Sequence, residues 1–299
     1  MRKFLPFLIL LLFSIFFLTG CVEEFYMNPP HKSIFQKEVN FSGEKSLNIT
    51  CKSGVADLKI APIETNSKKL FKLEVVYDDA NQKLHYDFTG NDLTITLYDF
   101  TRNDLTIPLE GRKSSKHLNS TITLFVSKKV PVSFDIRVGV GNGNIDLTGL
   151  KVKSFNIKTG VGDTDIFCKE KNEMVCEGIT IKNGVGDLSF IGLGNLNCKE
   201  FECTGGVGDC HIEVGDRWKG EVRGKVESGV GDVEIFFPES VAVEARVVGS
   251  KYTSSVSVDY DVFEKSNEHL YITRGFKEKD KKLYLKIVSG VGDVKIRVK

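Results

Sequence analysis

The chain has 299 residues, and its 41 Lys and Arg against 40 Asp and Glu give a net charge of +1 at neutral pH. This balance lacks the basic excess of nucleic-acid-binding domains, and charges of both signs are interspersed as on a solvated surface. Apolar and polar residues alternate along most of the chain, and long stretches of 3.6-residue periodicity are missing. The pattern predicts an all-β protein.

The first twenty residues have the features of an export signal. Arg2 and Lys3 precede an apolar run over 4–18, which is shorter than the ~20 residues of a membrane-spanning helix. The run ends in Leu-Thr-Gly-Cys at Cys21, which resembles the prokaryotic lipobox, whose cysteine is lipidated and becomes the mature N-terminus. We therefore predict a signal peptide over 1–20 and lipidation of Cys21, with an uncleaved signal anchor as the alternative. Either places the chain on the extracytoplasmic face of the cell membrane.

Residues 21–38 are predicted to form a lipidated tether, because Asn28-Pro29-Pro30 interrupts regular structure and the segment has little periodicity. The remainder, 39–299, is expected to form the folded domain.

One short motif recurs through that domain. The copies are SGVADLKI (53–60), GVGNGNIDL (139–147), TGVGDTDI (159–166), NGVGDLSF (183–190), GGVGDCHI (205–212), SGVGDVEI (228–235) and SGVGDVKI (289–296). The middle copies are spaced by roughly 19 to 24 residues, which is a repeat length typical of solenoids. Apolar residues alternate with polar ones on both sides of each copy, as expected of two strands that share one buried face. The repeats predict a single-stranded-type β-solenoid, in which rungs of strand, Gly-Val-Gly-Asp turn and strand stack ~4.8 Å apart.

Each residue of the turn has an expected role. Both glycines can take positive φ, the valine between them is predicted to pack inward, and the aspartate can bond backbone N–H groups as in an Asx turn. The predicted turn residues are Asp163, Asp187, Asp209, Asp232 and Asp293. Stacked carboxylates could also bind calcium, but the known glycine-rich calcium repeats have a shorter period, and a purely structural role is favoured.

The longer gaps between outer copies are expected to hold inserted strands. Alternating stretches lie within 69–138, and again at 236–249 and 281–290, with turn signals such as Thr89-Gly90-Asn91-Asp92 between them.

Six cysteines follow Cys21. Their even number in an exported chain suggests disulfides, and six allow 15 pairings. Cys176 and Cys198 each stand eleven residues before their Asp, so they should be stacked neighbours within the reach of a disulfide. Cys51, Cys203 and Cys210 could instead be buried hydrophobic residues.

No catalytic or metal-binding group emerges from the sequence. Cys210 and His211 form a nucleophile pair on paper, but neighbours on a strand point to opposite faces. Trp218 with its basic neighbours could mark a carbohydrate or anion contact, or an ordinary loop. We therefore predict no catalytic residues, no metal site and no cofactor.

The block over 123–167, TLFVSKKVPVSFDIRVGVGNGNIDLTGLKVKSFNIKTGVGDTDIF, resembles a family of adhesin-like β-solenoid domains of unknown function in bacteria and archaea. The segments FFPESVAVEARVVG and LKIVSGVGDVKI resemble the related C-terminal domains of membrane proteins that respond to cell-wall-active antibiotics. Together the resemblance spans nearly all of 40–299 and implies no catalytic residues. The chain departs from the pattern at Asn144, in place of Asp, at Ala56, in place of Gly, and in its extra cysteines.

These observations predict a lipid-anchored, adhesin-like binding or structural module of the cell envelope that is not an enzyme. Its expected partners are the membrane, through the anchor, and envelope glycans or a membrane protein, with no nucleic acid. The alternatives are an envelope-stress sensor or regulator that works with a membrane partner, and a polysaccharide-acting enzyme. Catalysis usually needs two carboxylates whose pKa values differ, and the repeated aspartates are too uniform for that.

Overall fold

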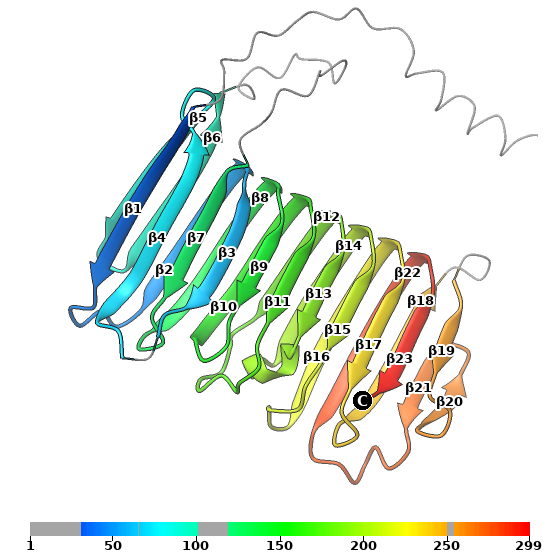
Figure 1. Ribbon diagram of the computed structural model, residues 1–299. Helices are drawn as coiled ribbons and strands as arrows, with labels where there is room; N and C mark the ends of the chain where they lie inside the picture. Colours follow the sequence, from blue (N-terminus) through cyan, green and yellow to red (C-terminus); the bar gives the residue numbers. More distant parts are fainter. Residues whose placement is uncertain (1–30, 65, 101–118, 250–253) are drawn as a thin grey trace, which may run out of the picture.

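The computed structural model describes residues 31–64, 66–100, 119–249 and 254–299. Two long β-sheets face each other along one axis, with the first strands at one end and β19 to β21 at the other (Figure 1). The described residues contain no α-helix, and Leu193–Leu196 forms the 3-10 turn η2, so the predicted all-β class is confirmed. The predicted signal peptide and Cys21 lie outside the described residues. No helix in the described ranges is long and apolar enough to cross a membrane.

Within the described ranges, sheet A has eleven strands and sheet B has twelve. The spatial order in sheet A is β1 (Lys32–Asn40), β4 (Lys69–Asp78), β7 (Thr121–Val126), β3 (Asp57–Pro62), β9 (Gly143–Asp146), β11 (Thr164–Phe167), β13 (Leu188–Ile191), β15 (Cys210–Glu213), β17 (Val233–Phe237), β23 (Val294–Val298), β19 (Val256–Val258). The order in sheet B is β20 (Phe263–Asn267), β21 (Leu270–Thr273), β18 (Ala242–Gly249), β22 (Lys282–Val291), β16 (Glu221–Val230), β14 (Glu200–Val207), β12 (Ile179–Val185), β10 (Lys151–Val161), β8 (Pro131–Val140), β2 (Leu47–Val55), β6 (Asp92–Asp99), β5 (Gln82–Thr89).

The middle of both sheets is built from one repeated unit, which we call a rung: a strand of sheet B, a glycine corner and the next strand in sheet A. Neighbouring rungs pair in parallel and in register, as in β10 on β12, where Val161 lies opposite Val185, and β11 on β13, where Thr164 lies opposite Leu188. Each rung therefore hydrogen-bonds to the rungs before and after it through both of its strands.

The last copy of the glycine motif in the sequence does not take the last place in the stack. Strands β22 and β23 lie between the β16–β17 rung and the β18–β19 pair, although they follow both in the chain. The segment between β19 and β22 supplies the antiparallel hairpin of β20 and β21, which ends sheet B.

Antiparallel strands cover the other end of the stack. Strand β1 pairs with β4, and β5 pairs with β6. The predicted tether over 21–38 is wrong in its last third, because β1 begins at Lys32 and its side chains alternate in burial. The sequence signal there is weak because β1 is an edge strand with one paired neighbour and few fully buried residues.

The core is the space between the two sheets. Inward side chains of successive rungs contact one another, as Phe134 and Phe155 do with ring centroids 5.8 Å apart. The predicted alternation is confirmed by the burial of Ile157 and Ile181 before the corner and of Leu188 and Phe190 after it. Since one rung alone leaves its apolar face in water, the stacking of rungs is what buries this core.

Candidate functional site

The glycine corner is held by a file of hydrogen bonds between rungs. The backbone N–H of each corner Asp donates to Oδ1 of the corner Asp one rung earlier, at 2.9 Å for Asp187 on Asp163 and 2.8 Å for Asp209 on Asp187. The file continues with the Asp232 N–H, which donates to Asp209, and the Asp293 N–H, which donates to Asp232, both at 2.8 Å. It ends where the Ser255 N–H donates to Asp293 at 3.2 Å. The carboxylate thus bonds the next rung, not the N–H groups of its own turn as an Asx turn would.

The direction of the neighbouring N–H groups explains this choice of residue. Gly162 and Thr164 donate to carbonyl oxygens of the following rung, at 2.8 and 2.9 Å. The N–H of Asp163, between them, points to the preceding rung and meets a side-chain oxygen there. A short side chain with an oxygen acceptor at this position therefore satisfies a donor that the sheet ladder leaves out.

The acceptor on the preceding rung identifies the corner residue of β8–β9. It is Asn142, whose Oδ1 accepts from the Asp163 N–H at 3.0 Å and whose own N–H donates to Asp57 at 2.8 Å. The assignment of Asn144 as the Asp equivalent is therefore wrong. Asn144 lies two residues further on, opposite Asp165 within sheet A. The glycine on either side of Asn142 made the sequence alignment ambiguous by two positions.

The two corner glycines are required for different reasons. The second takes positive φ, as at Gly186 (128°) and Gly208 (134°), as predicted. The first does not, but a Cβ on Gly184 would lie 2.3 Å from the carbonyl oxygen of Gly160. The first glycine therefore permits the close approach of stacked backbones, and the second permits the turn.

The corner valines do not pack inward, which corrects the prediction. They form an exposed file of side chains that are each 40 to 48% accessible: Val55, Val161, Val185, Val207, Val230 and Val291. The inward position belongs to the buried polar residue before the first glycine. Asn183 donates to the carbonyl of Gly186 at 2.6 Å, and Ser289 to that of Gly292 at 3.3 Å. These bonds close the bend from inside and leave the valine on the convex side.

The backbone favours the ionised form of one corner carboxylate, that of Asp232. The N–H of Asp293 lowers the pKa of Asp232 below its ordinary 3.8, and Lys295, whose Nζ is 3.3 Å away, lowers it further. At Asp232, one backbone N–H and one cation therefore favour the charged carboxylate. Across the described residues, His, Cys, Asp and Glu form no group that could hold a metal ion.

The six cysteines of the folded domain are buried, and all are free thiols in this structure. Cys176 and Cys198 are bridge partners in adjacent rungs, the neighbourhood that the repeat predicted, but they are not joined. Burial raises the pKa of Cys176 to about 11 and that of Cys198 to about 12. A disulfide between them stays a prediction.

Two other candidates are structural. Trp218 is 2% exposed and packs over Gly194, where an added Cβ would lie 2.4 Å from the indole ring. It belongs to the core and offers no surface contact to a carbohydrate. His211 lies on the outer face of sheet A, near Glu213 (3.5 Å) and Glu234 (3.7 Å), whereas Cys210 is buried on the inner side. The two residues form no nucleophile pair.

The outer face of sheet B carries rows of side chains that cross its strands. The row nearest the corner contains four cations in register, one on each of four adjacent strands: Lys52, Arg137, Lys158 and Lys182. We call these four residues the basic row. The sequence analysis missed it, although each member stands five positions before its corner Asp or Asn. Comparing equivalent positions across the copies would have shown it.

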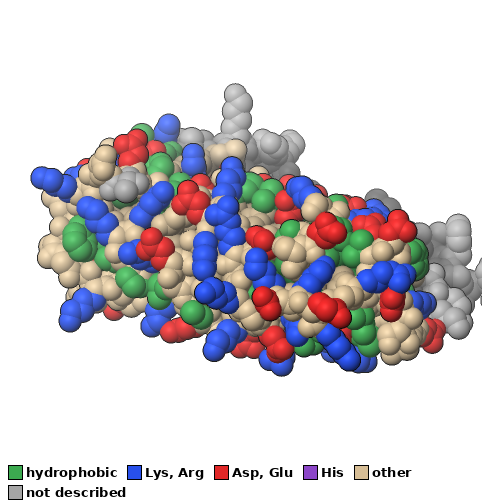
Figure 2. All heavy atoms as spheres, turned by 90° about the horizontal axis from the view of Figure 1, so that it is seen from below, with side chains coloured by type: hydrophobic (Ala, Val, Ile, Leu, Met, Phe, Trp, Pro, Cys, Tyr) green, Lys and Arg blue, Asp and Glu red, His purple; other side chains and the backbone are tan. Residues whose placement is uncertain are grey.

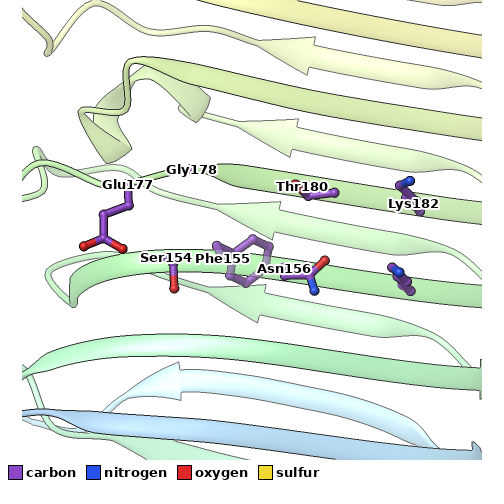
Figure 3. Close-up of a pocket in the computed structure, with 8 residues that line it drawn as sticks. Ser154, Phe155, Asn156, Glu177, Gly178, Thr180 and Lys182 are labelled. Atoms are coloured by element: carbon purple, nitrogen blue, oxygen red, sulfur yellow. The ribbon is translucent and has the colours of Figure 1, made fainter.

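A hollow of about 520 Å³ lies beside the basic row, between β10 and β12 (Figure 3). The hollow is lined by Lys158 and Lys182 from the basic row together with Ser154, Phe155, Asn156, Glu177, Gly178 and Thr180. Opposite Ser154 stands Gly178, where an added Cβ would meet nothing within 4 Å. The hollow is therefore open, with backbone exposed on one side.

Other surfaces mix the two signs of charge. Figure 2 shows acidic and basic side chains interspersed on the face seen from below, with a column of basic ones across its middle. A second hollow, of about 360 Å³, is lined by Lys128, Lys129, Lys151 and Lys171 but also by Glu64, Glu170 and Glu173. Lys151 there pairs with Glu173 at 3.2 Å, whereas in the basic row Arg137 alone has an ion-pair partner among the described residues, Asp135.

Comparison with known proteins places the chain in a family. Three solved structures are similar to this chain over most of their length, and each protein was named only provisionally for a role in adhesion. A cell adhesion protein from Clostridium sporogenes has 18% identity and a TM-score of 0.45, and the match covers 90% of this chain and 100% of that one. An adhesin from Bacteroides fragilis has 15% identity and a TM-score of 0.35, with 89% and 98% covered. An adhesin from Parabacteroides merdae has 13% identity and a TM-score of 0.38, with 88% and 95% covered.

No curated protein matches the chain. The family model for the N-terminal domain of toast_rack, DUF2154, matches residues 30–191 and 179–236, which is more than half of the sequence. This match confirms the family-level resemblance predicted from the glycine repeats. The chain belongs to the family defined by the N-terminal domain of toast_rack.

Proposed function

We propose that this protein is a non-catalytic binding module of the cell envelope, held at the extracytoplasmic face of the membrane by a lipid on Cys21. In this proposal the stacked rungs form a β-solenoid scaffold that presents its outer faces to envelope polymers. Strand β1 begins at Lys32, so only about ten residues would separate the lipid from the first strand. At ~3.5 Å per extended residue, this connection keeps the scaffold close to the bilayer.

One observation carries the proposal: the polar side chains form straight rows on flat sheet faces. On sheet B, equivalent residues of successive strands lie opposite one another, and the hollow beside them is open to solvent. Enzymes usually enclose their reacting groups in a concave, largely apolar pocket. Rows on an open face suit recognition of an extended ligand that spans several rungs.

A retention assay tests the binding function. The full chain, purified in detergent, is incubated with insoluble cell-wall and extracellular glycans, and both the bound fraction and soluble sugar products are measured. We expect retention on at least one envelope glycan without release of products. Release of new sugar ends would support the enzyme alternative, and absence of retention on every glycan would contradict a binding module.

A separate experiment tests the anchor. Cells that express the wild type or Cys21→Ser are fed a labelled fatty acid and fractionated. We expect label on the wild type and none on the variant. Equal label on both would contradict lipidation at Cys21.

A further inference from the structure

We propose that the basic row and the adjoining hollow bind a linear acidic polysaccharide, one whose sugar residues carry carboxylates as well as hydroxyls. This inference rests on the proposed binding function and names the class of ligand. The chain of sugars would lie across β2, β8, β10 and β12, parallel to the long axis of the stack.

The first support is the regular placement of the cations. Lys52 pairs with Arg137 in the register of β2 and β8, and Lys158 lies opposite both Arg137 and Lys182. Parallel strands place these residues ~4.8 Å apart, a spacing comparable to the length of one sugar residue. A polymer with one carboxylate on each sugar can therefore face one cation on each rung.

The second support is that these charges are poorly neutralised within the protein. Arg137 has one carboxylate neighbour, Asp135, at 3.3 Å. Among the described residues, Lys52, Lys158 and Lys182 form no ion pair with a carboxylate within 4 Å. Like charges at this separation repel by roughly 1 kcal/mol in water, so an anion along the row would relieve a repulsion.

The other half of the same face shows that the fold does not require such a row. After Lys182 the row continues with Thr204 and Glu227. There the neighbouring cation Lys225 is paired twice, with Glu202 at 3.1 Å and Glu227 at 2.9 Å. The same scaffold therefore also carries mixed charges at these positions, and the row of four adjacent cations lies in the half from β2 to β12.

The hollow indicates what else the ligand carries. Asn156 donates its amide N–H to Asp135 at 2.8 Å, but its Oδ1 is buried without a hydrogen-bond partner. Thr180 lines the same hollow and is opposite Asn156 in the register. The hydroxyl groups of Ser154 and Thr180 in the lining suit a ligand that brings hydroxyl groups of its own, and sugars have them at every residue.

A nucleic acid fits this face less well. Single-stranded nucleic acids are usually held by aromatic side chains on which their bases stack. The outward positions of these four strands hold no aromatic residue: they are Asn48, Thr50, Lys52, Pro131, Ser133, Asp135, Arg137, Lys151, Lys153, Ser154, Asn156, Lys158, Thr180 and Lys182. Hydroxyl and amide groups beside cations match an acidic sugar better than a base.

Binding assays with defined polymers test the proposal. The full chain in detergent is titrated with polygalacturonate, with polyglutamate as a carboxylate polymer without sugar hydroxyls, with dextran as a neutral glycan, and with single-stranded DNA. We expect polygalacturonate to bind most tightly and to weaken as salt increases, and dextran not to bind. Equal or tighter binding of polyglutamate or DNA would contradict a site for acidic sugars.

Variants locate the site. The double variant Lys158→Gln/Lys182→Gln should weaken polygalacturonate binding about tenfold, the effect expected when two charge contacts are lost. The matched control Arg246→Gln/Lys286→Gln removes two exposed cations from the other half of the same face and should change the affinity by less than about twofold. Equal losses in both would mean that only net charge matters, and would overturn the proposal.

The retention assay on envelope glycans separates this inference from the proposed function. If Lys158→Gln/Lys182→Gln binds those glycans as the wild type does, the acidic-sugar site is wrong and the binding module stands. If the wild type is retained on none of them, the proposed function itself fails.

Discussion

The backbone N–H of Asp187 donates a 2.9 Å hydrogen bond to Oδ1 of Asp163, its counterpart one rung earlier. Each corner Asp is therefore an acceptor for the next rung and a donor to the previous one. A rung that slipped by one residue would lose this bond and would also turn its buried side chains outward. The corner thus fixes the register on which the rows of the outer faces depend.

Removing one link of the file should weaken the stack. Asp187→Ala leaves the Asp209 N–H without its 2.8 Å partner, and we expect a loss of about 1 kcal/mol in the free energy of unfolding. Asp187→Asn keeps an acceptor, as Asn142 does naturally, and should cost less than about 0.5 kcal/mol. Urea unfolding measures both.

Asp165→Ala is the control for that pair. Asp165 is also an acid on the stack, facing outward from β11 next to the corner, and no hydrogen bond joins it to the file. An equal loss from Asp165→Ala and Asp187→Ala would show that charge, and not the hydrogen bond, determines stability at the corner.

The second corner glycine should tolerate no side chain. In Gly208→Ala the new Cβ would lie 2.2 Å from the carbonyl oxygen of Gly186, at a φ of 134°. We expect a loss of about 3 kcal/mol or more, because backbone cannot move aside without displacing a rung. The control is Gly90→Ala, because Gly90 also has positive φ (63°) but no atom lies within 4 Å of the new Cβ. Comparing the melting temperatures of the two variants separates the effect of the close contact from that of the backbone conformation. Similar melting temperatures for the two variants would contradict this.

The stability of the corner should depend on pH. The pKa of Asp232 is lowered on folding, chiefly by the Asp293 N–H, so its contribution is present above its ordinary value of 3.8 and is lost as the pH falls through the lowered pKa. The wild type should exceed Asp232→Asn in stability at neutral pH, and the difference should shrink in acid. Denaturant unfolding across this range measures it, and a difference that stays constant into acid would contradict the assignment.

The cysteines give a prediction that depends on the compartment. Folded protein should react slowly with alkylating reagents at neutral pH, because burial raises the pKa of these thiols, to about 12 at Cys51 and Cys210. After unfolding, protein made without its export signal should show all six domain thiols. Exported protein should lack the free thiols of Cys176 and Cys198, because these two residues are predicted to form a disulfide. Peptide mapping that finds these two thiols free in exported protein would rule out the predicted disulfide.

The repeat allowed much of this fold to be predicted from sequence. Period-two alternation around each glycine motif placed Ile157, Ile181 and Leu188 in the core, because each copy repeats the same phase. The corner itself was less predictable. Alternation would turn Val161 inward, but the bend interrupts the alternation, and Thr159 takes the inward position while the valine is exposed.

The binding face shows a second limit of sequence reasoning. Lys158 and Lys182 look like ordinary solvated lysines when each strand is considered alone. Only the register between strands, which depends on Asn142 as the corner residue of its rung, brings them into one row with Lys52 and Arg137. The tether boundary failed for a related reason, since the pairing of β1 with β4 depends on a strand far away in the chain.

Disulfide trapping at the corner tests the stacking most directly. Val161 and Val185 are exposed and opposite each other in adjacent rungs, whereas Val207 is one rung further. Val161→Cys/Val185→Cys should cross-link on mild oxidation, because ~4.8 Å between strands is within the reach of a disulfide. Val161→Cys/Val207→Cys, at about twice that distance, should not. Equal cross-linking of both pairs, or cross-linking of the distant pair alone, would contradict rungs that stack in register.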